Sequence, residues 1–226
     1  MPEGVPEPIP EHSSGSGRIL SWLNKVFPRF GFFLGVFAGV YVWVVILYCA
    51  LTSPWWAFTQ SSFSALGTSP AFGGNDSQPW IYNDVAMIPT GLMVMLFSLA
   101  ISAYSKNKMQ VMGSAFFFVG GIFLALIGVY HGGTYPHDFV STWFFVQAAL
   151  AVLTWGLGFL WEGRRQFGYG MISLAILSIA IAGAVHWPSV ATTEAFGIAA
   201  IDLWLVLMFF AMRKDVLGIG AKPNHG

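Results

Sequence analysis

Residues 109–161 read MQVMGSAFFFVGGIFLALIGVY, then HGGTYPHD, then FVSTWFFVQAALAVLTWGLGFLW. The outer two runs contain no charged residue, and each reaches the about 20 residues that an α-helix needs to cross a hydrocarbon core of about 30 Å. The polar stretch between them holds His131, His137 and Asp138. This pattern predicts a pair of membrane-crossing helices with titratable side chains in their connection.

The composition places the rest of the chain in a membrane as well. Of its 226 residues, 56% are hydrophobic and only 9% are charged, and the mean hydropathy is +0.67. A soluble domain carries roughly 25% charged residues because water must solvate its surface. The net charge of +0 gives no field that would recruit nucleic acid, and the lone cysteine, Cys49, excludes an intramolecular disulfide. We therefore expect an all-α, polytopic membrane protein without nucleic-acid partners.

Six apolar segments have the length of a membrane span. They are Gly31–Thr52, Asp84–Ala103, Met109–Tyr130, Phe139–Trp161, Tyr169–Trp187 and Ala195–Met212. Pro89 should bend the second segment and free a carbonyl group that a neighbouring helix or water must satisfy. Glycines in the third and fourth segments should permit close helix approach. The polar residues Gln147, Thr154 and Ser173 are expected to form hydrogen bonds between helices.

We divide the chain into four parts. Residues 1–17 are rich in proline, glycine and serine and predict a disordered tail. Residues 18–29 place apolar side chains on one helical face, which is typical of an amphipathic helix that lies in a membrane interface. Residues 30–213 form the six-helix transmembrane domain, and residues 214–226 form a second tail.

Positive charge indicates the orientation. All 10 lysines and arginines lie in the N-terminal part, in the loops at 105–108 and 162–166, or after Met212. With six spans these regions share one side of the membrane, and basic residues stay cytoplasmic. We expect a plasma-membrane protein with both termini cytoplasmic. The loops predicted to face outward are 53–83, 132–138 and 188–194.

The first outer loop, residues 53–83, is long for so small a protein. It opens with Pro54-Trp-Trp56, which suits an aromatic anchor at the membrane interface. It ends where Asn83 or Asp84 could cap the second helix. Asn75-Asp-Ser77 matches the acceptor triplet for N-glycosylation, so Asn75 is a candidate site.

Titratable side chains gather near the predicted outer ends of segments three to six. They are His131, His137, Asp138, His186, Glu194 and Asp202. Asp202 stands apart because, at about 1.5 Å per residue, it lies roughly 10 Å inside its helix. An ionisable group at that depth must be paired, protonated or beside a water-filled cavity.

Three interpretations of these groups stay open. Imidazole and carboxylate ligands suit zinc, copper or iron. The metal candidates are His131, His137, Asp138 and His186, and a bis-histidine haem would use His131 and His186. Alternatively, His137, Asp138 and Asp202 form an acid–base or proton-handling site. In a structural interpretation, Asp138 caps a helix, where its charge interacts favourably with the helix dipole. His131 and His186 then lie at the headgroup level, and Asp202 bonds a tryptophan or tyrosine across the bundle.

Short motifs in this background resemble a known family. They are Phe63-Ser-Ala-Leu-Gly67, Trp80-Ile-Tyr-Asn83 leading into Gly91-Leu-Met93, and His137-Asp-Phe-Val-Ser141 followed by Phe144-Phe145. They make the chain similar, over roughly residues 31–212, to a prokaryotic six-helix membrane family catalogued as domain of unknown function 998, itself distantly similar to Frag/DRAM/Sfk-type membrane proteins. The resemblance implies a six-helix fold with a structured outer loop and no established reaction. Ala65 departs from the family pattern, in which an acidic residue is often found.

The sequence therefore predicts a membrane protein without an assignable reaction. We expect an accessory subunit of a membrane complex or a lipid-interacting component. Its partners would be the lipid bilayer and membrane proteins that contact the helix faces and the 53–83 loop. The alternative is a membrane enzyme or proton-coupled carrier that uses the outer His/Asp cluster. A third interpretation is a haem or quinone electron-transfer subunit. The leading expectation is that the chain binds no cofactor, and a metal or haem is the alternative.

Overall fold

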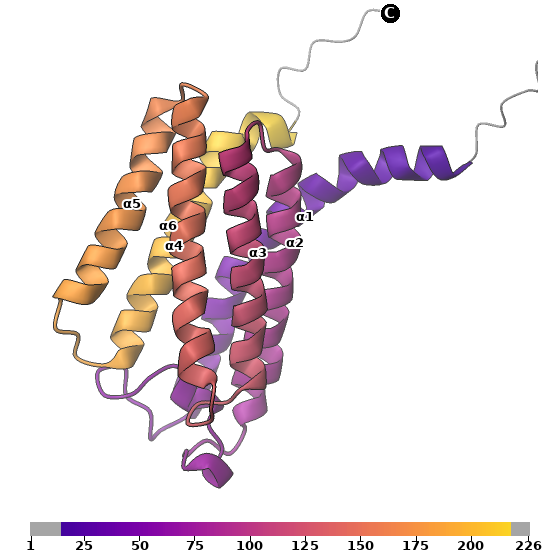
Figure 1. Ribbon diagram of the computed structural model, residues 1–226. Helices are drawn as coiled ribbons and strands as arrows, with labels where there is room; N and C mark the ends of the chain where they lie inside the picture. The colour runs from indigo at the N-terminus through magenta and orange to yellow at the C-terminus, as the bar shows by residue number, and fades with distance from the viewer. Residues whose placement is uncertain (1–14, 218–226) are drawn as a thin grey trace, which may run out of the picture.

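The computed structural model describes residues 15–217, which form a bundle of six long helices and contain no strand (Figure 1). The long helices are α1 (Gly15–Thr52), α2 (Ile88–Ala103), α3 (Lys108–Val129), α4 (His137–Trp161), α5 (Arg165–Ala184) and α6 (Val190–Leu217). The π-helix η3 (Ile81–Met87) runs directly into α2. Six spans in this range are long and apolar enough to cross a membrane. The predicted all-α, six-span membrane architecture is confirmed.

The predicted end of the fifth span is wrong. Helix α5 ends at Ala184 rather than at Trp187. The Trp187 indole folds back and donates its Nε1–H to the Ala182 carbonyl at 3.1 Å. Pro188 follows and has no N–H with which to extend a helix. His186 consequently lies outside α5 and is exposed.

The sixth span begins earlier than predicted, at Val190 rather than at Ala195. Ser189 and Thr192 fix this start, because each side-chain hydroxyl accepts a hydrogen bond from the backbone N–H of the other, both at 3.2 Å. Such reciprocal bonding satisfies N–H groups that a helix start leaves unpaired. Glu194 therefore lies within the helix and not in the preceding loop.

Both ends of the described chain are helical beyond the predicted spans. Helix α1 begins at Gly15 and includes residues 18–29, with Pro28 inside it. Its N-terminal part projects sideways from the bundle (Figure 1), and the placement of this part in a membrane interface stays a prediction. Helix α6 continues to Leu217. The predicted tails lie almost entirely outside the described residues.

The segment between α1 and η3 covers one end of the bundle, at the bottom of Figure 1. It contains two 3-10 helices, η1 (Ser64–Gly67) and η2 (Pro70–Phe72). Within this segment, the side chains of Phe63 and Leu66 are buried. Trp56 stacks on Phe63 with ring centroids 5.8 Å apart and donates its Nε1–H to the Ser62 carbonyl at 2.8 Å. The predicted structured outer loop is confirmed.

Pro89 is the second residue of α2 and leaves a backbone carbonyl group of η3 without its helical partner. Because proline lacks an N–H, the carbonyl of Val85, four residues earlier, loses its usual helical partner. Tyr41 of α1 donates its hydroxyl to this carbonyl at 2.6 Å. The prediction that a neighbouring helix serves the freed carbonyl is confirmed.

Asn83 ties the outer loop to the second span. Its side chain is 2% exposed and donates to the Gly67 carbonyl at 2.7 Å. A Cβ atom at Gly67 would lie 2.3 Å from Asn83 Oδ1, so the loop approaches this closely only with glycine. The predicted cap by Asn83 or Asp84 is wrong, because the helical backbone is already formed at Ile81.

Glycines bring neighbouring helices into backbone contact. A Cβ atom on Gly91 of α2 would lie 2.6 Å from the Gly121 carbonyl oxygen of α3. A Cβ atom on Gly156 of α4 would lie 3.1 Å from the Gly168 carbonyl oxygen of α5. The predicted close approach through glycines of the third and fourth spans is confirmed. Helices α4 and α5 touch at this end and diverge toward the outer loop (Figure 1).

The predicted interhelical hydrogen bonds of three polar residues are not observed. The Thr154 hydroxyl donates within its own helix to the Leu150 carbonyl at 2.7 Å, as hydroxyls in helices commonly do. Gln147 Oε1 is buried without a partner in the described chain, and Ser173 is exposed.

Polar contacts between α3 and α4 lie instead at the end opposite the outer loop. Asn107 caps α3 by accepting from the backbone N–H groups of Met109 and Gln110 at 3.1 and 3.2 Å. Its amide also donates to the Gly158 carbonyl at 3.0 Å. The buried Gln110 amide donates to Glu162. These hydrogen bonds join the start of α3 to the end of α4.

The positive charges of the described spans and loops lie toward that same end. From residue 26 to residue 217 they are Arg29, Lys106, Lys108, Arg164, Arg165, Arg213 and Lys214. The outer-loop end contains no lysine or arginine in this range. This separation is what the predicted orientation requires.

The Tyr41 contact leads to a stability prediction. Tyr41→Phe keeps the ring but removes the donor to Val85, and we expect it to lower the free energy of unfolding by about 1 kcal/mol. Tyr48→Phe is the matched control, because Tyr48 is on the same helix and 52% exposed. Reversible unfolding in mixed micelles measures both. Equal stabilities of the two variants would contradict the role assigned to Tyr41.

Candidate functional site

A cleft of about 600 Å³ lies between α4, α5 and α6 on the outer-loop side. The α4 residues that line it come mostly in adjacent pairs, and the pairs recur every three or four positions from His137 to Val152. They therefore form one helix face. Small side chains from all three helices leave the space open: Ala149 on α4, Ala182 on α5 and Ala200 on α6.

The cleft opens sideways toward the surroundings of the bundle. Its lining includes Val146, Ile179 and Val190, whose side chains are 37%, 61% and 59% exposed. In a membrane-spanning bundle such apolar side chains face lipid. From His137 to Val152 the α4 wall is about 22 Å long at 1.5 Å per residue. It is therefore longer than half of a hydrocarbon core of about 30 Å.

Polar side chains are concentrated at the outer end of the cleft. They are Ser64, His137, Asp138, Ser141, Thr142, Thr193 and Glu194. The walls below them are mainly alanine, valine, leucine, isoleucine and phenylalanine. The cleft thus has one polar end and a long apolar body.

His137 is the first residue of α4 and is only 5% exposed. Its Nδ1 lies 2.6 Å from the Tyr130 carbonyl oxygen. A carbonyl can only accept, so Nδ1 carries a proton and the orientation of the ring is fixed. Nε2 then faces Ser141, whose Oγ lies 3.5 Å away beside the cleft.

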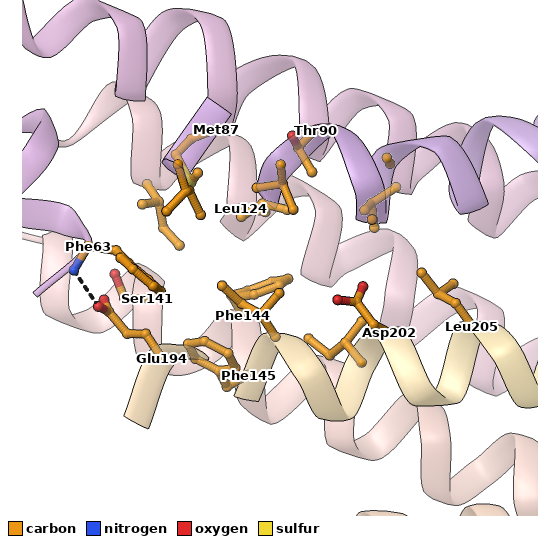
Figure 2. Close-up of a pocket in the computed structure, with 18 of the residues that line it drawn as sticks. Phe63, Met87, Thr90, Leu124, Ser141, Phe144, Phe145, Glu194, Asp202 and Leu205 are labelled. Atoms are coloured by element: carbon orange, nitrogen blue, oxygen red, sulfur yellow. Dashed lines mark hydrogen bonds between the residues drawn. The ribbon is translucent and has the colours of Figure 1, made fainter. Parts of the chain in front are cut away.

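A smaller, more interior cavity lies next to the cleft (Figure 2). Its volume is about 80 Å³, measured as the space that the centres of water molecules can reach. One water molecule needs roughly 10–15 Å³ by the same measure. Glu194 and Asp202 of α6 both border it, together with apolar side chains such as Met87 and Leu124. The cavity can therefore hold several water molecules beside two carboxyl groups.

Asp202 bonds across the bundle to α1. The Trp43 indole donates its Nε1–H to Asp202 Oδ2 at 2.6 Å. Gly39 leaves room for this arrangement, since a Cβ atom there would lie 2.8 Å from Asp202 Oδ1. The prediction that Asp202 bonds a tryptophan or tyrosine is confirmed. Within residues 26–217, no lysine or arginine forms an ion pair with it.

Glu194 connects the outer loop, the cavity and the cleft. Its Oε2 accepts a hydrogen bond from the Phe63 backbone N–H at 2.6 Å, drawn as a dashed line in Figure 2. Next to it, Phe145 reaches from α4 to α6, where a Cβ atom on Gly197 would lie 2.5 Å from the ring. Both side chains border the cleft and the cavity. They form part of the wall between the two spaces.

The predicted site residues are only partly brought together. His137 and Asp138 share the cleft, whereas Asp202 borders the interior cavity. His131 packs against the Phe72 ring at 5.7 Å, and His186 is exposed. No group of three or more His, Cys, Asp or Glu side chains in the described chain is arranged to hold a metal ion. The metal and haem assignments stay predictions.

Two smaller predictions concern Asp138 and Asn75. Helix α4 starts at His137, and its cap position, Pro136, offers no side-chain hydrogen bond. Asp138 lies in the first turn, where a negative charge favours the helix dipole, but it is not the predicted cap. Asn75 is exposed in the outer loop, and its glycosylation stays a prediction.

Several residues of the site escaped the sequence analysis. Phe145 and Thr193 line the cleft, and Trp43 bonds Asp202, and only helix packing brings them to the site. A detectable signal was the α4 face formed by Asp138, Ser141 and the positions that follow at helical spacing.

Comparison with known proteins gives a family. The family model described as a protein of unknown function, DUF998, matches residues 36–211. The chain belongs to this family. The match spans every residue that lines the cleft. No curated protein and no solved structure matches the chain, and the distant likeness to Frag/DRAM/Sfk-type proteins stays a prediction.

The bond between Trp43 and Asp202 leads to a second stability prediction. Trp43→Phe removes the donor and leaves a half-buried carboxyl group unpaired, so we expect a loss of about 1–3 kcal/mol in the free energy of unfolding. Asp202→Asn should cost less, because its amide oxygen still accepts the indole N–H. Trp80→Phe is the control, since Trp80 is 54% exposed. Wild-type stability of Trp43→Phe in a detergent unfolding assay would refute this role.

Proposed function

We propose that the protein binds a single amphiphilic lipid in the cleft between α4, α5 and α6. The observation that carries this proposal is the shape of the cleft: about 600 Å³, apolar walls, a lateral opening and a polar outer end. Ligand sites typically measure about 300–1,000 Å³ and combine apolar walls with a few polar groups. The tail would lie along the small side chains, and the polar end would meet His137, Ser141 and Glu194.

The packing of the helices supports a built cleft. Gly156 and Gly168 hold α4 and α5 in backbone contact at one end. Toward the outer end, Phe145 is wedged between α4 and Gly197 of α6. The glycine contact fixes α4 against α5 at one end, and the Phe145 ring holds α4 at a distance from α6 at the other. The volume of the cleft is therefore set by helix packing.

Lipid binding inside a membrane draws little on the hydrophobic effect. Lipid tails are as apolar as the walls of the cleft, so moving a tail between them gains little free energy. Selectivity must then come from the fit of the tail and from the polar groups at the outer end. The role as an accessory subunit and the protein partners of the 53–83 loop stay predictions.

We also propose that both termini are cytoplasmic and that the outer loop faces away from the cytoplasm. The one-sided distribution of lysine and arginine supports this orientation. The plasma membrane is the membrane that we propose.

Cysteine labelling tests the orientation. Cys49 is the only cysteine and is buried, so the background reaction is low. We expect a membrane-impermeant maleimide to label Asn75→Cys in intact cells and Lys108→Cys only after permeabilisation, because the two sites lie at opposite ends of the bundle. The reverse result would invert the topology.

A pair of neighbouring alanines tests the cleft. Ala200 lines it, whereas Ala199 is exposed and does not. Ala200→Phe should reduce the co-purified lipid about tenfold, since overpacking costs 1–3 kcal/mol. Ala199→Phe should leave it unchanged. Native mass spectrometry of washed, detergent-purified protein measures both, and equal lipid retention in the two variants would reject the cleft as the site.

A further inference from the structure

The outer end of the cleft is rich in hydrogen-bond acceptors and contains no cation from the described spans. Asp138 and Glu194 contribute two carboxyl groups to its lining. His137 has committed Nδ1 to the Tyr130 carbonyl, which leaves Nε2 on the side of Ser141 and the cleft. Every lysine and arginine between residues 26 and 217 lies toward the opposite end of the bundle, as its position in the helices and loops requires.

Glu194 is the best placed of these acceptors. Its Oε2 is held by the Phe63 N–H, which fixes the carboxyl group at the wall between the cleft and the interior cavity. Oε1 forms no hydrogen bond with the described chain, and no ion pair involves Glu194 there. Figure 2 shows the carboxyl group near Ser141, at the end of the cavity away from Asp202.

We infer that the amphiphile bound in this cleft carries a primary ammonium group, and that Glu194 and Asp138 hold this group at the outer end. The inference rests on the proposed lipid site and adds the chemistry of the headgroup. Three observations carry it: the polar end of the cleft, the buried His137 imidazole turned toward that end, and the carboxyl groups of Glu194 and Asp138, which form no ion pair within the described chain.

The complementarity follows from the donors and acceptors. An ammonium group has three N–H donors and no acceptor, so it matches carboxylate, imidazole and hydroxyl acceptors. Bonds between charged partners are about twice as strong as neutral ones, and they gain further strength where water is scarce. A phosphate or carboxylate headgroup would need arginine or lysine, which this end of the described bundle lacks. A hydroxyl headgroup can bond there but gains no charge pairing.

Three probes with the same tail and different headgroups test this inference: dodecylamine, dodecanol and dodecanoate. Each is isotopically labelled and bound to the full chain in nanodiscs of phosphatidylcholine, with Ala200→Phe nanodiscs as the background for simple partitioning. We expect the amine to bind about tenfold more tightly than the alcohol, and the carboxylate to bind most weakly.

Glu194→Gln separates binding from structure. Its amide oxygen still accepts from the Phe63 N–H, so the outer loop should stay in place. We expect about a tenfold loss of amine affinity with unchanged binding of the alcohol. Asp138→Asn, at an exposed position, gives a second reading if the glutamine variant unfolds.

The outcomes distinguish the two levels of the proposal. If the alcohol or the carboxylate binds as tightly as the amine, above the Ala200→Phe background, the headgroup inference is overturned and the lipid site stands. The same holds if neither carboxyl variant weakens the amine. If none of the probes binds above that background, the proposed function itself is overturned.

Discussion

The structure depends on one constraint: inside a hydrocarbon layer, a backbone polar group or a carboxyl group that finds no partner within the protein costs several kcal/mol. The constraint decides which contacts cross the bundle. Tyr41 serves the carbonyl that Pro89 leaves free, and Trp43 serves the carboxyl group of Asp202. Both donors are on α1, so this helix supplies η3 and α6 with polar partners that lipid cannot offer. Hydrophobic residues fill the remaining interior, but they do not select these neighbours, because lipid would accommodate them equally well.

Close packing elsewhere has a geometric consequence. Helix α4 meets α5 backbone to backbone at Gly156, and the two helices diverge from there toward the 53–83 loop (Figure 1). On its other side α4 faces α6 through the Phe145 ring, which lies against Gly197. The cleft occupies the space between the three helices, and the small side chains along it leave it open. The candidate site is therefore a product of how the helices are fastened rather than of an inserted loop or domain.

Hydropathy and length were sufficient to predict the six spans, because each apolar run matches the thickness of a membrane. They could not predict where α5 and α6 meet, since the Trp187 back-bond and the exchange between Ser189 and Thr192 are local polar contacts that override hydropathy. The chemistry of the partner of Asp202 was predictable, but its identity was not. The separation of the outer histidines, and the cleft itself, depend on the order and tilt of helices, which no local pattern encodes.

Glu194 links two regions that the chain keeps far apart in sequence. The same carboxyl group that borders the cleft also holds the outer loop through Phe63. A molecule that draws this group toward itself must change the free energy of the loop contact. By thermodynamic reciprocity, anything that binds and stabilises the loop in its docked form must change the affinity of the cleft by the same factor. Any occupancy of the cleft that involves Glu194 is thus coupled to the docking of the 53–83 loop through this one carboxyl group.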